Sequence, residues 1–110
     1  METYLGLDLG GTKLLIGEVD AYGNILRYKR YDSGFFNQKA AFDIIRHSMD
    51  DYVANVGWVG EKPVAMGVGL IGRVDPNRGV WLQIDPHRTE SIDLADELTA
   101  LYGIPCRIDN

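Results

Sequence analysis

The chain has 110 residues, of which 45% are hydrophobic and 25% are charged, as in one folded domain and unlike disordered or fibrous proteins. Its formal net charge of −5 argues against a nucleic-acid or anionic-membrane partner, because clustered lysines and arginines hold such partners. The one basic cluster, Arg27, Lys29 and Arg30, is interpreted as a solvated strand edge. A single cysteine, Cys106, and the lack of an apolar run of about 18 residues predict a cytoplasmic protein.

Alternating apolar residues predict three strands, over residues 4–9, 14–19 and 25–31. Short turns separate these strands, so they are expected to form an antiparallel meander. Residues 38–56 then carry apolar side chains at helical spacing. Asn37 is the expected N-cap of this helix and Gly57 its C-cap.

The second half predicts further strands and a helix. Residues 64–70 are almost free of polar side chains, which favours a central strand buried on both faces. Residues 71–86 are expected to form a loop with an extended piece at 80–82, and Ser91 to cap a second helix that ends at Gly103. A last strand begins at Cys106. The order β-β-β-α-β-α-β predicts an α/β fold with a mixed five-stranded sheet.

The sharpest motif is the turn after the first strand, Asp8-Leu9-Gly10-Gly11-Thr12-Lys13. Two glycines allow positive φ angles, so that successive N–H groups can point at one phosphate oxygen. Thr12 adds a hydroxyl and Lys13 a cation, and Asp8 could hold Mg²⁺ through water. A plain hairpin turn explains the same residues, so spacing alone leaves both interpretations open.

A second glycine motif, Gly67-Val68-Gly69-Leu70-Ile71-Gly72, matches the dinucleotide pattern G-x-G-x-x-G. That pattern needs a helix that begins within the glycine loop. Here the turn-rich stretch 73–79 follows, after three strands instead of one. An oxidoreductase is therefore disfavoured. Trp58 and Trp81 are interpreted as packing residues.

Three motifs together resemble the ROK family of bacterial sugar kinases and repressors, members of the actin-like ATPase superfamily. Residues 7–13 look like its phosphate-1 motif. Residues 67–75, Gly-Val-Gly-Leu-Ile-Gly-Arg-Val-Asp, are similar to its G-I-G-x-P-G-x-V-D segment. Ile104-Pro105 and Ile108-Asp109-Asn110 resemble the strand that leads into its E-N-D-A motif. Three motifs in order are more specific than any one.

The resemblance implies a ribonuclease H-like, actin-like ATPase domain, with residues 1–110 as the N-terminal lobe of a two-lobed kinase. Carried over by position, the residues implied to bind the ATP phosphates are Asp8, Gly10, Gly11, Thr12 and Lys13, and Asp8 is also the indirect Mg²⁺ ligand. The residues implied to bind substrate are Gly72, Arg73 and Asn110. The family's catalytic aspartate directly follows Asn110, so this chain is expected to hold no catalytic residue and to be inactive alone.

The implied function of the parent protein is ATP-dependent phosphorylation of a hexose or N-acetylhexosamine, with ATP and Mg²⁺ as cofactors. The alternative is the sugar-sensing domain of a ROK-type transcriptional repressor, which would carry a helix-turn-helix before the first strand; only three residues precede Tyr4 here. A nucleotide-binding module without chemistry is a third interpretation of the chain alone. The family's zinc motif lies outside this chain, and relatives suggest a homodimer.

The chain departs from the family pattern around the sugar loop. Leu70-Ile71-Gly72 replaces the usual x-P-G, and residues 72–79 are similar to N-acetylmannosamine kinases, in which an arginine follows the glycine. Arg73 could then donate hydrogen bonds to the sugar, or it could be a surface arginine paired with Asp75. Residues 84–88 replace a Pro-Asn-Leu-Pro-like stretch, which leaves the acceptor sugar open.

Overall fold

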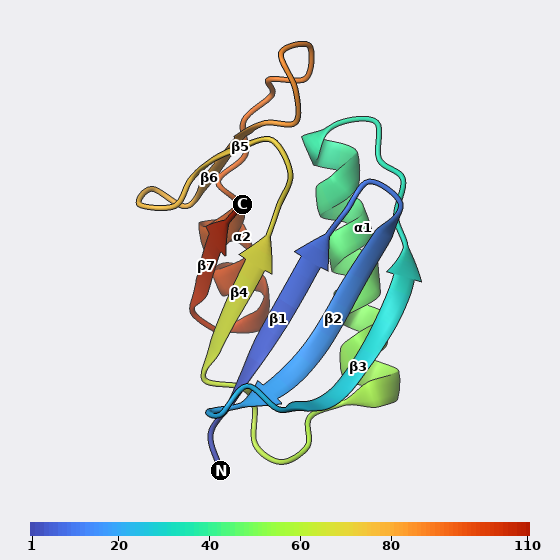
Figure 1. Ribbon diagram of the computed structural model, residues 1–110, viewed down its shortest axis with the longest axis vertical. Coiled ribbons are helices and arrows are strands. Elements are labelled where there is room, and N and C mark those ends of the chain that lie inside the picture. The colour runs from blue at the N-terminus through green and yellow to red at the C-terminus, as the bar shows by residue number, and fades with distance from the viewer.

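Five strands form a mixed sheet in the order β3-β2-β1-β4-β7 (Figure 1) in the computed structural model, which describes residues 1–110. The strands are β1 (Thr3–Leu9), β2 (Lys13–Asp20), β3 (Ile25–Asp32), β4 (Ala65–Gly69) and β7 (Cys106–Asp109). Strand β1 pairs antiparallel with β2 and parallel with β4, while β2–β3 is antiparallel and β4–β7 parallel. The predicted meander and mixed sheet are confirmed.

The first helix follows its sequence signals closely. Helix α1 (Gln38–Asp51) continues as a π-helical turn, η1 (Tyr52–Val56), so together they fill the predicted range. The Asn37 side chain accepts a hydrogen bond from the Ala40 N–H at 2.8 Å. Gly57 has a φ of 75° and its N–H donates to the Tyr52 carbonyl, so both predicted caps are confirmed.

The second helix, α2 (Leu94–Tyr102), begins later than predicted. Ser91 is not its cap, because the neighbouring Ile92 exchanges two backbone hydrogen bonds with Trp81 and is thereby held in extended pairing. Asp93 occupies the N-cap position without a side-chain hydrogen bond. Gly103 ends the helix in the left-handed conformation, as predicted. Neither helix is long and apolar enough to cross a membrane.

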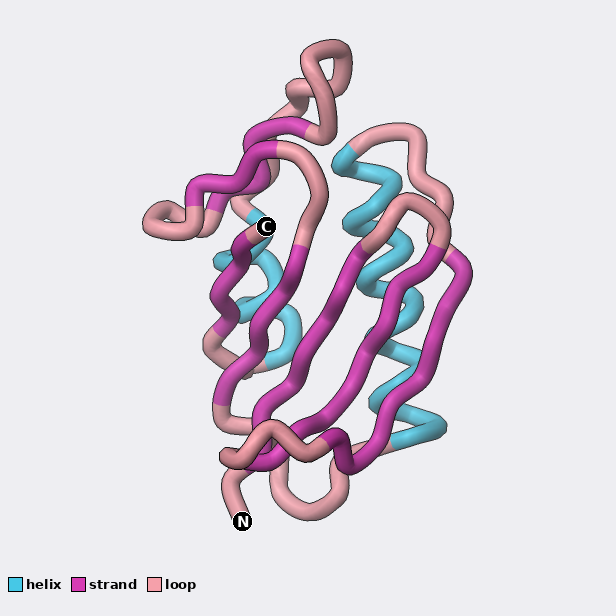
Figure 2. Tube along the Cα trace, viewed as in Figure 1, coloured by secondary structure: helices cyan, strands magenta, loops and turns pink.

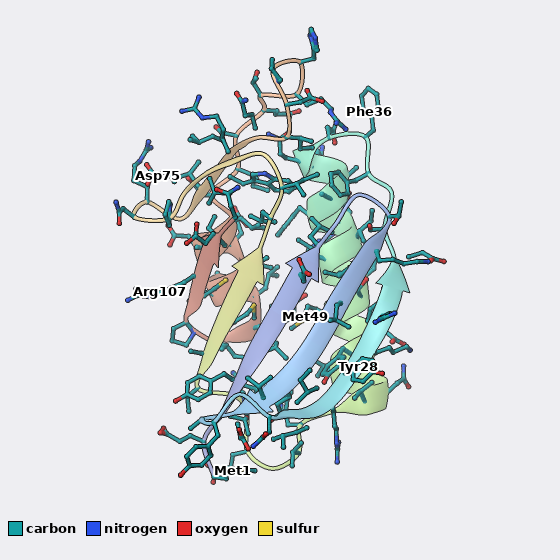
Figure 3. The ribbon with its side chains drawn as sticks, viewed as in Figure 1. Met1, Tyr28, Phe36, Met49, Asp75 and Arg107 are labelled. Carbon is teal, nitrogen blue, oxygen red and sulfur yellow. The ribbon has the colours of Figure 1, made fainter.

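Both helices pack on one face of the sheet (Figure 1). The buried side of β1 carries Leu5, Leu7 and Leu9, which join Ile45 of α1 and Leu98 of α2 in one apolar core. The opposite face, called the open face here, carries the alternate residues of each strand, among them Gly6, Asp8, Leu15, Gly17, Tyr28 and Gly67. Tyr28 is labelled on it in Figure 3.

This one-sided packing corrects the prediction for residues 64–70. Strand β4 is an inner strand between β1 and β7, as predicted, but within residues 1–110 it is not buried on both faces, because Gly67 is exposed. Glycine and alanine lack polar side chains but have little apolar surface to bury. Their presence therefore imitates the composition of a strand with two covered faces.

A second correction concerns residues 71–86. Strands β5 (Arg73–Asp75) and β6 (Val80–Gln83) pair as an antiparallel hairpin beyond the ends of β4 and β7 (Figure 2). The Asp75 carboxylate accepts hydrogen bonds from the Asn77 and Arg78 N–H groups and fixes the turn at the hairpin tip (Figure 3). Predicting only an extended piece at 80–82 missed the partner strand, which is three residues long.

Glu18 is a fully buried carboxylate that joins three segments. It accepts hydrogen bonds from the Thr3 hydroxyl at 2.5 Å and from the Val59 N–H at 2.9 Å. We expect Glu18→Ala to lower the free energy of unfolding by about 1–3 kcal/mol, because the buried Thr3 hydroxyl loses its acceptor. Urea denaturation measures this, with exposed Glu61→Ala as the control. Equal midpoints for both variants would contradict the role.

Candidate functional site

The candidate site lies where the parallel strands β1, β4 and β7 end side by side (Figure 1). The turn at residues 10–12 follows β1, the loop 70–72 follows β4, and Asn110 follows β7. In open α/β sheets ligands bind outside the carboxyl ends of the strands. The topology therefore brings the three sequence motifs to one edge of the molecule.

The turn after β1 is closed by its own backbone and by Ser33. The Gly10 N–H donates to the Lys13 carbonyl at 2.8 Å. Ser33 donates its N–H to the Thr12 carbonyl at 2.9 Å and its hydroxyl to the Gly10 carbonyl at 3.0 Å. The N–H groups of Gly11 and Thr12 have no acceptor in the protein. The turn thus presents two free backbone donors at its tip.

The predicted positive φ angles of this turn are wrong. Neither Gly10 nor Gly11 lies in the positive-φ region. The turn therefore closes without a residue in the left-handed conformation. Packing does not require glycine at position 11 either, since a Cβ built there would meet nothing within 4 Å. The position that a side chain at residue 11 would take is therefore open space.

Lys13 is held at the same turn by an ion pair with Asp32. The two side chains are 63% and 88% exposed, so the pair lies in solvent and contributes little to stability. The hydrogen bond from Lys13, and then its charge, lower the pKa of Asp32 below its ordinary value. The lysine therefore lies beside the turn as predicted, with its charge balanced by a carboxylate.

Asp8 is exposed on the open face and has no hydrogen-bond or ion-pair partner. The structure contains no group of three or more His, Cys, Asp or Glu side chains that could hold a metal ion. A lone carboxylate is nevertheless compatible with Mg²⁺, which keeps several waters and takes its other ligands from substrate phosphates.

The loop 70–72 is held from two sides. The Asn110 side-chain amide donates to the Gly72 carbonyl at 2.6 Å and the Trp81 indole N–H donates to the Ile71 carbonyl at 2.9 Å. Gly72 has a φ of 84°, and a Cβ there would lie 2.0 Å from the Gln83 carbonyl oxygen. Trp81 packs as predicted, and its bond to this loop was missed because nothing in the sequence pairs the two segments.

Arg73 follows Gly72 and is exposed, without a hydrogen bond or an ion pair. The surface pair with Asp75 that the sequence left open is not formed, because Asp75 binds the backbone of its own turn. The structure therefore brings Gly72 and Asn110 into contact, and the exposed side chain of Arg73, the next residue, has no partner in the protein.

The side chains of the basic cluster on β3 are not all free in solvent, contrary to what the sequence suggested. Arg27 donates to the Val56 carbonyl at 2.9 Å, and Lys29 pairs with Asp51 at 2.7 Å. Both bonds run to the helical side of the sheet. Arg30, between them and the turn, faces the other way.

The model of the ROK family matches residues 4–110. The chain belongs to the ROK family. A glucokinase from Streptomyces coelicolor is 28% identical over 106 residues, which are 96% of this chain and 32% of that protein. The chain therefore spans about a third of the length of the curated relatives it matches. It is thus similar to sugar kinases of this family.

Solved structures agree on the fold. A ROK family glucokinase from Streptomyces griseus, in complex with glucose and AMPPNP, has a TM-score of 0.76 and 27% identity, over 98% of this chain and 33% of its own. A ROK family transcriptional regulator, a homologue of the E. coli MLC protein, has a TM-score of 0.87 and 20% identity, over 98% of this chain and 27% of its own. The mixed sheet is that of the actin-like ATPase fold, as predicted.

The ion pair at the turn can be tested by titration. In Lys13→Met the pKa of Asp32 should rise toward that of an ordinary aspartate, because the ammonium group that favours the carboxylate is gone. Carboxyl chemical shifts followed by NMR against pH measure the change. Lys29→Met, which removes the partner of Asp51 instead, is the matched control. An unchanged Asp32 titration in Lys13→Met would show that the pair is not populated.

Proposed function

We propose that this chain is the N-terminal lobe of a two-lobed sugar kinase that phosphorylates a hexose or an N-acetylhexosamine with ATP. The observation that carries the proposal is the pair of N–H groups at Gly11 and Thr12, which have no acceptor in the protein and lie in an exposed turn that also carries Lys13. Backbone donors with an adjacent cation suit phosphate oxygens. The S. griseus relative, crystallised with glucose and an ATP analogue, supports this choice of ligands.

Within this proposal the turn binds the phosphates of ATP. The N–H groups of Gly11 and Thr12 donate to phosphate oxygens, and Gly10 gives the turn its close backbone approach. Lys13 neutralises phosphate charge once it exchanges Asp32 for the nucleotide. Asp8 would hold Mg²⁺ through water, and the ion would supply further charge neutralisation on the phosphates.

The sugar would bind at the other wall, formed by Gly72, Arg73 and Asn110. The Asn110 amide nitrogen is engaged with the Gly72 carbonyl, while its carboxamide oxygen accepts no hydrogen bond from the protein. That oxygen is therefore available to a sugar hydroxyl. Arg73, which follows Gly72 and is exposed without a partner, would supply donors that suit a hydroxyl or the acetamido oxygen of an N-acetylhexosamine.

The base that accepts the proton of the sugar hydroxyl is proposed to come from outside this chain. Phosphoryl transfer needs the acceptor hydroxyl in line with the γ-phosphate and a carboxylate that accepts the hydroxyl proton, and this role is assigned to an aspartate of the full-length protein. The isolated 110 residues should accordingly be inactive. A cytoplasmic location, a homodimer and zinc in the remaining chain belong to the same proposal.

The alternative function is the sugar-sensing domain of a ROK-type repressor. The high TM-score to the transcriptional regulator favours it only at the level of fold, which regulators and kinases share. The discriminating result is ATP turnover by the full-length protein: sugar binding without sugar-dependent ADP release would favour the repressor and reject the kinase.

Gly11→Ala tests the phosphate turn. The methyl group meets no protein atom within 4 Å, so the melting temperature should be unchanged, while the KM for ATP rises about tenfold because the methyl occupies space that phosphate needs. A coupled ADP-release assay on the full-length protein measures this. Gly60→Ala is the matched control, since Gly60 also has free space and no positive φ. Equal KM values for the two variants would reject the role.

Arg73→Ala tests the sugar wall. Loss of a charged donor to bound sugar should lower kcat/KM roughly tenfold for at least one acceptor in a panel of hexoses and N-acetylhexosamines. The KM for ATP should stay constant. The control is Arg78→Ala in the hairpin turn. If no acceptor loses kcat/KM in Arg73→Ala, the residue is a surface arginine only.

A further inference from the structure

Arg30 lies in the same cross-strand row as Asp8, the carboxylate at the end of β1. In the sheet register Asp8 of β1 is opposite Leu15 of β2, and Leu15 is opposite Arg30 of β3. All three residues face the open side of the sheet. Because neighbouring strands are about 4.8 Å apart, the Cα atoms of Asp8 and Arg30 are roughly 10 Å apart.

The same residues line a hollow next to the turn. Its volume is about 270 Å³, and its lining residues are Asp8, Gly10, Thr12, Lys13, Leu15 and Arg30. Two cations, one carboxylate and the backbone of the glycine turn thus converge on one space. Leu15 between Asp8 and Arg30 forms an apolar floor. This space begins at the turn proposed to bind phosphate and extends over the face of β2 and β3.

Arg30 is the cation of this hollow without a partner. Lys13 is paired with Asp32, whereas Arg30 makes no hydrogen bond and no ion pair. Its neighbours on β3 both have partners, since Arg27 binds a carbonyl and Lys29 binds Asp51. The Arg30 charge is therefore the one in the cluster that remains available to an anion.

We propose that Arg30 is a second phosphate-binding cation, which contacts the phosphate chain of the nucleoside triphosphate across the open face from Asp8. The inference rests on the proposed function and extends its site beyond the family motif. Arginine suits this place because its planar guanidinium donates two parallel hydrogen bonds to phosphate oxygens. Asp8, at the other end of the row, would hold the Mg²⁺ ion of the same phosphate chain through water.

Equilibrium binding to the full-length protein tests the proposal with three probes: ATP, inorganic tripolyphosphate and adenosine. In Arg30→Ala the Kd for ATP and for tripolyphosphate should rise roughly tenfold, the effect of one charge-assisted hydrogen bond, while the Kd for adenosine stays unchanged. Lys29→Ala, one residue away and directed to the other face, should change none of them. Arg30→Lys keeps the charge without the planar fork and should recover part of the loss.

Two outcomes separate this inference from the kinase proposal. If the wild-type protein turns over ATP with sugar but Arg30→Ala binds tripolyphosphate as tightly as Lys29→Ala does, the inference is overturned and the kinase proposal survives. If no sugar supports ATP turnover, yet Arg30→Ala alone weakens tripolyphosphate binding, the phosphate site is upheld and the kinase proposal fails. Melting temperatures of the three variants show that each is folded.

Discussion

The position of β1 between an antiparallel and a parallel neighbour is the constraint on which the site depends. Antiparallel pairing with β2 requires a tight turn at the carboxyl end of β1. Parallel pairing with β4, and of β4 with β7, brings the loop at 70–72 and Asn110 to that same end. A meander alone would place its turns at alternate ends. The mixed pairing therefore brings three short motifs, far apart in sequence, to one edge of the sheet.

The packing of both helices on one face of the sheet determines which charged residues of β3 have a partner. Because helices cover only one face, successive residues of β3 have different environments: Lys29 is directed to the helical side and pairs with Asp51, while Arg30 faces the open side without a partner. In the sequence, Lys29 and Arg30 are adjacent and belong to one basic cluster. Their different chemistry follows from the two-residue period of a strand, and it appears only once the register with β2 is known.

The parts of the fold that local signals determine could be predicted, and those that depend on distant partners could not. Asn37 and Gly57 cap the first helix through bonds within a few residues. The prediction of Ser91 as a cap was wrong because the adjacent Ile92 is paired with Trp81. No local sequence pattern indicates this pairing. The candidate site behaves likewise: its residues were found by motif, but the bonds from Asn110 and Trp81 to the loop required the folded chain.

Glycines show why residue identity alone does not assign a role. Gly72 and Gly11 both belong to motifs of the proposed site, yet the backbone requires only the first, because a Cβ at position 72 would collide with the Gln83 carbonyl and its φ is positive. The fold would tolerate a side chain at position 11. Neither the φ of Gly11 nor its neighbours therefore explain why this position is a glycine. Together with the N–H groups of Gly11 and Thr12, which have no acceptor in the protein, this open position supports the proposal of a phosphate-binding turn over that of a plain hairpin turn.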